Sequence, residues 1–179
     1  MADSENNIIN GLNQAKINEI LDSMRDDPEV LEAITGPWKA RVVWDTGFRT
    51  KSFMRTHVVE MDEPEGLDAT DAAASAHEQL LSAVGSCMSV GFVLNATKRG
   101  IKINDLEIVL EGNFENILKW AGHSDTGNPG YPEIKAKLFV SADANEDTLR
   151  ELWKLAVEGS PVTQTVAHET KVSTDFEKV

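Results

Sequence analysis

Residues 77–100 read HEQLLSAVGSCMSVGFVLNATKRG and form the most apolar helical stretch of the chain. Between Leu80 and Leu94 nearly every position is apolar or small. We predict one long helix from about Ser75 to Arg99, with Gly100 as its C-terminal cap. A helix that is apolar on all sides is buried on most of them. In a chain of 179 residues, this pattern predicts a core that is shared with a second subunit.

The single cysteine of the chain, Cys87, lies inside this predicted helix. A lone thiol cannot close a disulfide within its own chain, so any thiol chemistry needs a second sulfur from elsewhere. A buried cysteine usually acts only as a small apolar residue, and an ordinary thiol is mostly protonated at neutral pH. A reactive Cys87 would therefore need a nearby cation or hydrogen-bond donors.

Ser75-x-x-Glu78 is the pattern of a capping box, in which the glutamate turns back to the amide of the N-cap residue. Nine residues at about 100° each place Glu78 and Cys87 on opposite faces of a straight helix, about 13 Å apart along its axis. The two side chains could serve one site only if the same helix of a second chain, or a bridging arginine, brought them together.

Two helices are predicted over residues 8–35. Apolar side chains recur at helical spacing over residues 17–24, and Asp27-Pro28 supplies an N-cap and a first-turn proline for a second, short helix. Gly36-Pro37 ends that helix. From Trp38 to Trp44 the residues alternate as in a half-buried strand, and residues 48–61 continue as one or two more strands. We expect the N-terminal helices to pack on the body of the protein or on a partner subunit.

The rest of the chain alternates between strands, loops and one more helix. Residues 62–74 are acidic and predict a solvated loop, and residues 115–132 hold too many glycines and prolines for regular structure. Strands are expected over residues 106–114, 134–140 and Thr170 to Phe176, and an amphipathic helix over residues 143–159. This order of elements predicts an α+β fold in a single domain.

Composition narrows the classes of function. The net charge of −13 repels phosphate backbones, and no strong basic patch appears, so we expect no nucleic-acid partner. The sequence has no uninterrupted run of about 18 apolar residues, so we predict no membrane span. Its N-terminus is acidic, so we predict no secretory signal and a cytoplasmic location. The four histidines lack metal-ligand spacing and no glycine-rich phosphate loop is present, so we expect neither a metal nor a cofactor.

Three segments together resemble the OsmC/Ohr family of thiol-dependent hydroperoxide reductases, in a branch that lacks the second cysteine. They are residues 77–87, Lys98-Arg99-Gly100-Ile101 and Ser160-Pro161-Val162-Thr163. The resemblance extends from about Trp38 to the C-terminus. It implies a helical extension over residues 1–36 and an OsmC-like domain over residues 37–179. It also implies antiparallel sheets wrapped around two long central helices in an intertwined homodimer.

The resemblance implies catalytic roles for Cys87, Glu78 and an arginine of the first hairpin. In active members the glutamate holds the arginine, and the arginine lies against the thiolate. Arg49 is the expected arginine, with Arg41 and Arg55 as alternatives. A guanidinium beside the sulfur would lower the thiol pKa and could donate a hydrogen bond to the peroxide oxygens.

This chain departs from the peroxidatic members at Ser160, where they carry the second cysteine, and at Ala76-His77, which replaces the proline usual before the glutamate. The resemblance therefore implies a peroxidase that reduces organic hydroperoxides or hydrogen peroxide through Cys87, with an external thiol or dithiol as resolving partner. The alternative is a non-catalytic dimer that binds a small apolar ligand or senses oxidants.

Overall fold

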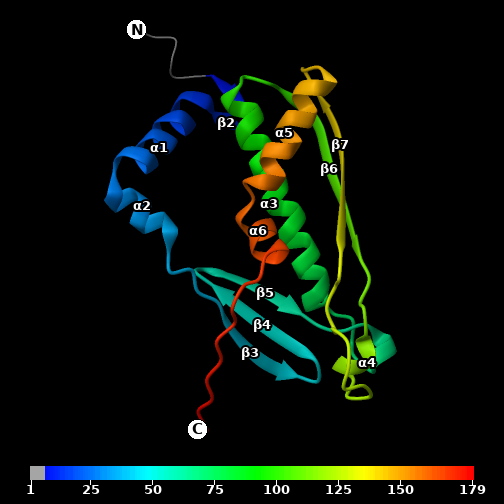
Figure 1. The fold of residues 1–179 in the computed structure, drawn as a ribbon. Helices are drawn as coiled ribbons and strands as arrows, with labels where there is room; N and C mark the ends of the chain where they lie inside the picture. Colours follow the sequence, from blue (N-terminus) through cyan, green and yellow to red (C-terminus); the bar gives the residue numbers. More distant parts are fainter. Residues whose placement is uncertain (1–6) are drawn as a thin grey trace. The chain divides into compact units, whose positions relative to one another are not determined.

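The computed structural model describes residues 7–179, in which antiparallel strands and α-helices make a mixed α+β fold (Figure 1). The chain divides into two compact units, one ending at Ser82 and the other comprising Ala83–Val179, and each is described by itself. The predicted domain boundary after residue 36 stays a prediction.

The first unit begins with a small hairpin and two helices. The hairpin pairs β1 (Ile8–Ile9) with β2 (Leu12–Asn13). The prediction of helix from residue 8 is therefore wrong up to Asn13, because the chain turns back on itself at Asn10 and Gly11, both with positive φ. Helix α1 (Gln14–Asp26) is capped by the Asn13 side chain, which accepts from the amide of Lys16. Helix α2 (Pro28–Thr35) is capped by Asp27 and has proline in its first turn, as predicted. Neither helix has a buried residue, and the apolar stripe of this pair is at most half-buried within the described chain.

After the two helices, the first unit contains a three-stranded antiparallel sheet. Its order is β3 (Arg41–Thr46), β4 (Arg49–Met54) and β5 (His57–Met61), and the chain then enters a short 3-10 turn, η1 (Glu65–Leu67). The first strand starts at Arg41 and not at Trp38. The prediction that it is half-buried is wrong for this chain, because every residue of β3 is exposed on both faces.

Helix α3 (Ala76–Lys98) is the predicted long helix, and Gly100 follows it with φ 71°, the left-handed conformation expected of a C-terminal glycine. Its buried residues lie mainly along one side, namely Val84, Gly85, Met88, Phe92, Ala96 and Thr97. One chain alone does not bury the helix on most sides, since Val90 is 67% exposed. The shared core with a second subunit stays a prediction.

By length and composition alone, α3 could cross a membrane, and it is the one such helix in the described part of the chain. The sequence prediction looked for an uninterrupted apolar run and so missed this property. It is weak support for a membrane span, because the core helix of a soluble protein has the same composition.

In the second unit, helices α3 and α5 (Glu146–Glu158) pack on one face of a long hairpin made of β6 (Ile103–Gly112) and β7 (Ile134–Ala142) (Figure 1). Residues on these strands alternate between half-buried and exposed, as a sheet with one covered face requires. The core consists of Phe92 and Ala96 of α3 with Leu152 and Ala156 of α5. A bidentate ion pair at 2.9 and 2.8 Å also joins Arg99, which directly follows α3, to Glu151 of α5.

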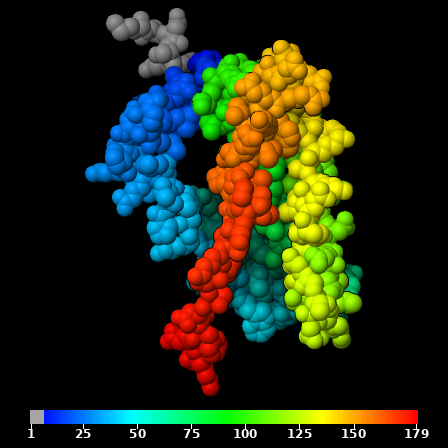
Figure 2. Space-filling model, viewed as in Figure 1, coloured from blue at the N-terminus to red at the C-terminus, as the bar shows by residue number. Residues whose placement is uncertain are grey.

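The remaining segments of the second unit differ in part from prediction. The loop between β6 and β7 is irregular, as predicted, except for one helical turn, α4 (Ile117–Trp120). A further helix, α6 (Pro161–Ala167), was not predicted. The predicted strand from Thr170 to Phe176 is wrong: the segment is extended and exposed, with no strand partner among the described residues (Figure 2). Its alternating pattern finds no strand to pair with between residues 7 and 179.

Candidate functional site

Cys87 is a free, half-buried thiol on α3. By helical periodicity it shares a face with Leu80, Ala83, Val90 and Leu94, and it lies near the middle of that stripe. Leu80 is 39% exposed and Val90 is 67% exposed. The sulfur therefore lies on the apolar face of α3 that its own chain leaves largely open, next to the buried face that holds Val84 and Met88.

Glu78 has a structural role at the start of α3. Its carboxylate accepts from the backbone amide of Ser75 at 2.8 Å and from the Ser75 hydroxyl at 2.7 Å, which is the glutamate half of the predicted capping box. The hydrogen bond from the Ser75 hydroxyl is the largest cause that lowers the pKa of this carboxyl, and the bond from the Ser75 amide is the next. The carboxylate is thus already engaged with the N-terminus of the helix.

The three candidate arginines have different surroundings. Arg49, at the start of β4, has its Nη2 atom 3.5 Å from Oε2 of Glu60 on β5. The Arg41 guanidinium lies over the ring of Phe53, 4.3 Å from its centroid. Arg55 lies in the turn between β4 and β5 with φ 55° and is exposed. Among residues 7–179, only Arg49 of these three has a carboxylate partner.

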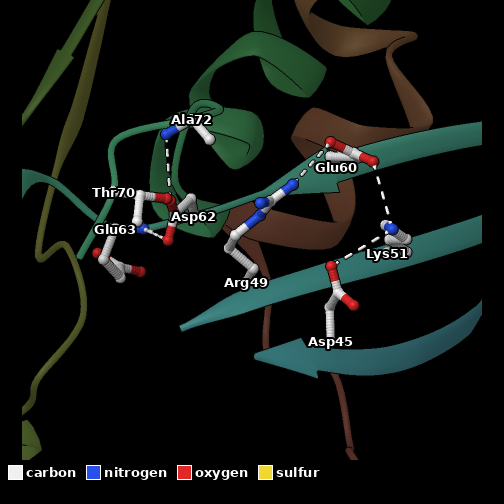
Figure 3. Close-up of polar contacts among 8 residues, drawn as sticks. All are labelled: Asp45, Arg49, Lys51, Glu60, Asp62, Glu63, Thr70 and Ala72. Carbon is white, nitrogen blue, oxygen red and sulfur yellow. Dashed lines mark hydrogen bonds and ion pairs between the residues drawn. The ribbon is translucent and has the colours of Figure 1, made fainter. Parts of the chain in front are cut away.

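Arg49 ends a row of alternating charges that crosses the three-stranded sheet (Figure 3). Lys51 lies directly opposite Glu60 in the β4–β5 register, with Nζ 3.7 Å from Oε1, and also contacts Asp45 of β3 at 3.3 Å. Arg49 lies two residues before Lys51 on the same face of the strand, so it reaches Glu60 diagonally. Sequence reasoning did not single out Glu60, although the alternation of β4 and β5 could have suggested it once the register was known.

Asp62 organises the acidic loop after β5 (Figure 3). This residue is 2% exposed, and its carboxylate accepts from the Thr70 hydroxyl at 2.5 Å and from the amides of Ala72 and Glu63 at 3.1 and 2.9 Å. The Thr70 hydroxyl is the largest cause that lowers the pKa of Asp62, followed by the Ala72 amide. The predicted solvated loop is thus wrong for Asp62, which satisfies backbone amides and does not extend into solvent.

Ser160 is 2% exposed and caps helix α6. Its Oγ atom accepts from the Thr163 amide at 3.2 Å and from the Thr163 hydroxyl at 2.8 Å. The residue therefore has a structural role at the position where the resemblance places a second cysteine.

A hollow of about 250 Å³ lies beside the buried side of α3 in the second unit. Its lining is mostly apolar and comes from α3, the start of β7 and α6, and includes Met88, Tyr131, Ile134, Thr163 and Val166. Cys87 does not line it. No cluster of three or more histidine, cysteine, aspartate or glutamate side chains in the described part of the chain is placed to hold a metal ion.

The predicted site residues divide between the two units. Cys87 belongs to the second unit, whereas Arg49 and Glu78 belong to the first. Their assembly into one site therefore stays a prediction. The second unit supplies a partly accessible thiol on an apolar helix face. The first unit supplies the guanidinium of Arg49, which forms an ion pair with Glu60 on the sheet.

Solved structures of similar fold come from several bacteria. An OsmC-like protein from Mycoplasma pneumoniae has 18% identity and a TM-score of 0.63 over 74% of this chain and 88% of its own. An OsmC-like protein of unknown function from Vibrio cholerae has 13% identity and a TM-score of 0.61, covering 75% and 96%. An organic hydroperoxide resistance protein from Elizabethkingia anophelis, with thiocyanate bound, has 13% identity and a TM-score of 0.53, covering 73% and 88%. Identities this low show the fold alone.

No curated protein sequence matches the chain at a significant level. The family described as OsmC-like protein matches residues 69–175, a segment that runs from the acidic loop through α3, the long hairpin, α5 and α6. This match covers more than half of the sequence and agrees with the fold, so the chain belongs to the OsmC-like family.

Proposed function

We propose that this protein is a thiol-dependent peroxidase of the cytoplasm that reduces organic hydroperoxides or hydrogen peroxide through Cys87. The observation that carries the proposal is the position of the thiol. Cys87 is half-buried on an apolar face of the central helix, in a chain of the OsmC-like family. The hydroperoxide resistance protein from Elizabethkingia anophelis, which has a similar fold, supports the same direction.

The proposed enzyme is a homodimer in which the open face of α3 is covered by a second copy. Burying Val90, Leu80 and their neighbours removes apolar area from water, worth about 25 cal/mol per Å². In the proposed site the Arg49 guanidinium lies against the Cys87 sulfur and stabilises the thiolate. Glu78 then acts mainly by fixing the start of the helix that carries Cys87.

The proposed reaction balances with an external thiol as reductant. The Cys87 thiolate attacks one peroxide oxygen, the O–O bond breaks, and the leaving alkoxide takes up a proton to become an alcohol. The sulfur is oxidised to a sulfenic acid. An external thiol then forms a mixed disulfide with loss of water, and a second thiol reduces that disulfide and restores Cys87. Ser160 cannot replace the external thiol, because a hydroxyl does not form a disulfide.

Mass spectrometry after one equivalent of cumene hydroperoxide tests the proposal. We expect Cys87 to gain one oxygen, or an adduct of a sulfenic-acid trap, and to return to the thiol when a dithiol is added. The Cys87→Ser variant should consume no peroxide and should elute as the same dimer in size-exclusion chromatography. An unmodified Cys87 in the folded wild-type protein would remove the peroxidase proposal.

A second candidate is the binding of a small apolar ligand, for which the hollow beside Met88 and Ile134 is the supporting observation. Its volume of about 250 Å³ lies just below the range common for ligand sites, so it suits a small molecule. A ligand-binding protein without peroxidase activity should bind such a molecule equally well after Cys87→Ser. Isothermal titration with benzene-sized and decane-sized probes distinguishes this function from peroxide reduction.

A further inference from the structure

An open groove lies in the first unit, lined by the end of α2, the segment that follows it, and the end of β4 with its turn. Its volume of about 800 Å³ is in the range common for small-molecule sites. The apolar part of its lining includes Pro37, Trp38, Ala40 and Met54. All of its lining residues belong to one compact unit, so the groove is defined without the second unit.

Trp38 forms a fixed wall of this groove. Its Nε1 atom donates to the carbonyl oxygen of Ile34 in the last turn of α2, at 3.2 Å. The indole lies against Gly36, where an added Cβ would be 2.8 Å from the Trp38 amide nitrogen and 3.1 Å from Cδ1 of the ring. Gly36 also has φ 122°, a value that favours glycine. The indole is thus held in place although Trp38 is 69% exposed, so a ligand that stacks on it does not have to order it first.

The charged residues that line the groove are both cations, Lys39 and Arg55, and no described acidic residue lines it. Among residues 7–179, neither of these side chains forms an ion pair. Two unpaired cations beside one apolar groove are unusual in a chain whose net charge is −13. An anion bound here would accept charge-assisted hydrogen bonds, and the planar guanidinium of Arg55 can hold a carboxylate with two parallel N–H donors.

Arg55 also has a backbone conformation that arginine rarely adopts. It is the first residue of the two-residue turn between β4 and β5, because Met54 pairs with His57. Its φ of 55° lies in the left-handed region, where hairpin turns favour glycine, asparagine or aspartate. The arginine therefore costs backbone energy that no ion pair in the described chain offsets. Strain of this kind is typical of residues whose side chain has a function.

We propose that this groove binds an aromatic carboxylate, with its ring stacked on Trp38 and its carboxylate held by Lys39 and Arg55. The exposed indole favours a planar apolar body, and the two unpaired cations favour a negative charge. Cys87 and Arg49 do not line the groove, so the proposal does not rest on the peroxidase function.

A nitrogen–proton correlation NMR spectrum of the full chain tests the proposal. The sequence has four tryptophans, so the spectrum has one indole N–H signal for each, and Trp38→Phe identifies the signal of Trp38. The probe is naphthoate; naphthamide has the same rings without the charge, and octanoate has the charge without the rings. We expect naphthoate to shift the Trp38 signal along a saturable curve, and both comparison probes to bind about five- to tenfold more weakly.

Substitution of each cation tests its part in binding. Lys39→Gln and Arg55→Gln should each weaken naphthoate binding about two- to fivefold, as is usual for exposed charges, and should leave naphthamide binding unchanged. The matched control is Lys16→Gln, which removes an exposed cation of α1 that does not line the groove and should leave both affinities unchanged.

Arg55→Asn separates ligand binding from a structural role of Arg55. Asparagine tolerates the left-handed backbone, so this variant should raise the urea midpoint of unfolding while it weakens naphthoate binding. A lowered midpoint would show that Arg55 stabilises the turn, and would overturn its assignment to a ligand.

Three results would overturn the proposal as a whole. In the first, naphthoate leaves the Trp38 signal unmoved. In the second, naphthoate and naphthamide bind with equal affinity. In the third, the Trp38 signal changes on dilution of the protein but with no probe, because a second copy of the chain then covers the groove. Circular dichroism of each variant verifies that the fold is retained.

Discussion

Two glycines of α3 give a sharp test of how this helix packs. A Cβ added at Gly91 would lie 3.2 Å from Cα and 3.4 Å from the carbonyl oxygen of Ala156, in the backbone of α5. A Cβ added at Gly85 would lie 2.5 Å from Cδ1 of Leu110, at the end of a flexible side chain. Another backbone therefore approaches α3 closely at Gly91, whereas at Gly85 the neighbour is a side chain. The two neighbours differ, however, in how easily they can move.

Replacing either glycine by alanine gains about 1 kcal/mol of helix propensity. At Gly85 the Leu110 side chain can rotate, so we expect Gly85→Ala to stay within about 1 kcal/mol of wild type. At Gly91 the backbone of α5 must shift within the Phe92–Leu152 core, and overpacking there costs about 1–3 kcal/mol. Gly91→Ala should therefore be the less stable variant, and Gly91→Val should be destabilised by about 2–3 kcal/mol, because it adds further bulk and lacks the full propensity gain.

Urea unfolding followed by circular dichroism measures these differences, at one fixed protein concentration because assembly adds to apparent stability. The midpoint should fall in the order Gly85→Ala, Gly91→Ala, Gly91→Val, with an unchanged slope. A Gly91→Ala protein about 1 kcal/mol more stable than wild type would show that only propensity matters there. The close approach of α3 and α5 would then have no energetic consequence, and the packing argument would fail.

Three further predictions concern the core residue Phe92, the helix cap Ser160 and the buried carboxylate of Asp62. Truncating the fully buried ring in Phe92→Ala should cost about 3–5 kcal/mol, read from the same urea curves. Ser160→Ala removes the N-cap of α6 and should cost about 1 kcal/mol, with no loss of peroxide consumption if an external thiol resolves Cys87. The pKa of Asp62 is lowered in the folded state, so its contribution to stability is present above the unfolded value of about 4 and is lost as the pH falls through the folded value. We expect the Asp62→Asn variant to be less stable than wild type at neutral pH, and wild type to lose stability more steeply below about pH 4. Parallel curves of the urea midpoint against pH for the two proteins would contradict this role of Asp62.

Local signals in the sequence account for most of the elements. Asp27-Pro28 marks the start of α2, Gly100 follows the end of α3, and Ser75-x-x-Glu78 caps α3, because each depends on contacts within one or two helical turns. Strand ends and the short helix α6 were less predictable. Pro161 and the Ser160 hydroxyl start α6, yet a seven-residue helix gives too short a pattern to recognise.

The site was less predictable than the fold, for a physical reason. Cys87 could be singled out because it is the only thiol, but a partner for Arg49 depends on which residues meet across a ladder. The register that places Glu60 diagonally to Arg49 is the pairing of β4 with β5, which the turn between these two strands fixes. A shift of one residue would turn Glu60 to the other face of the sheet, so its contact with Arg49 could be found only from the structure.

At two places the sequence pattern predicts buried apolar residues, and in the single chain these residues are exposed. Helix α3 has the composition of a helix buried all round, yet Val90 is 67% exposed, and residues 170–176 alternate like a strand, yet Val172 is 82% exposed. Each pattern calls for apolar cover that this chain does not provide among its described residues. Both surfaces leave apolar side chains in water, which costs free energy unless something covers them. They agree if the unit that folds is larger than one chain, as in the proposed homodimer. Dilution should then lower the urea midpoint, whereas a midpoint that does not depend on concentration would require another explanation for both surfaces.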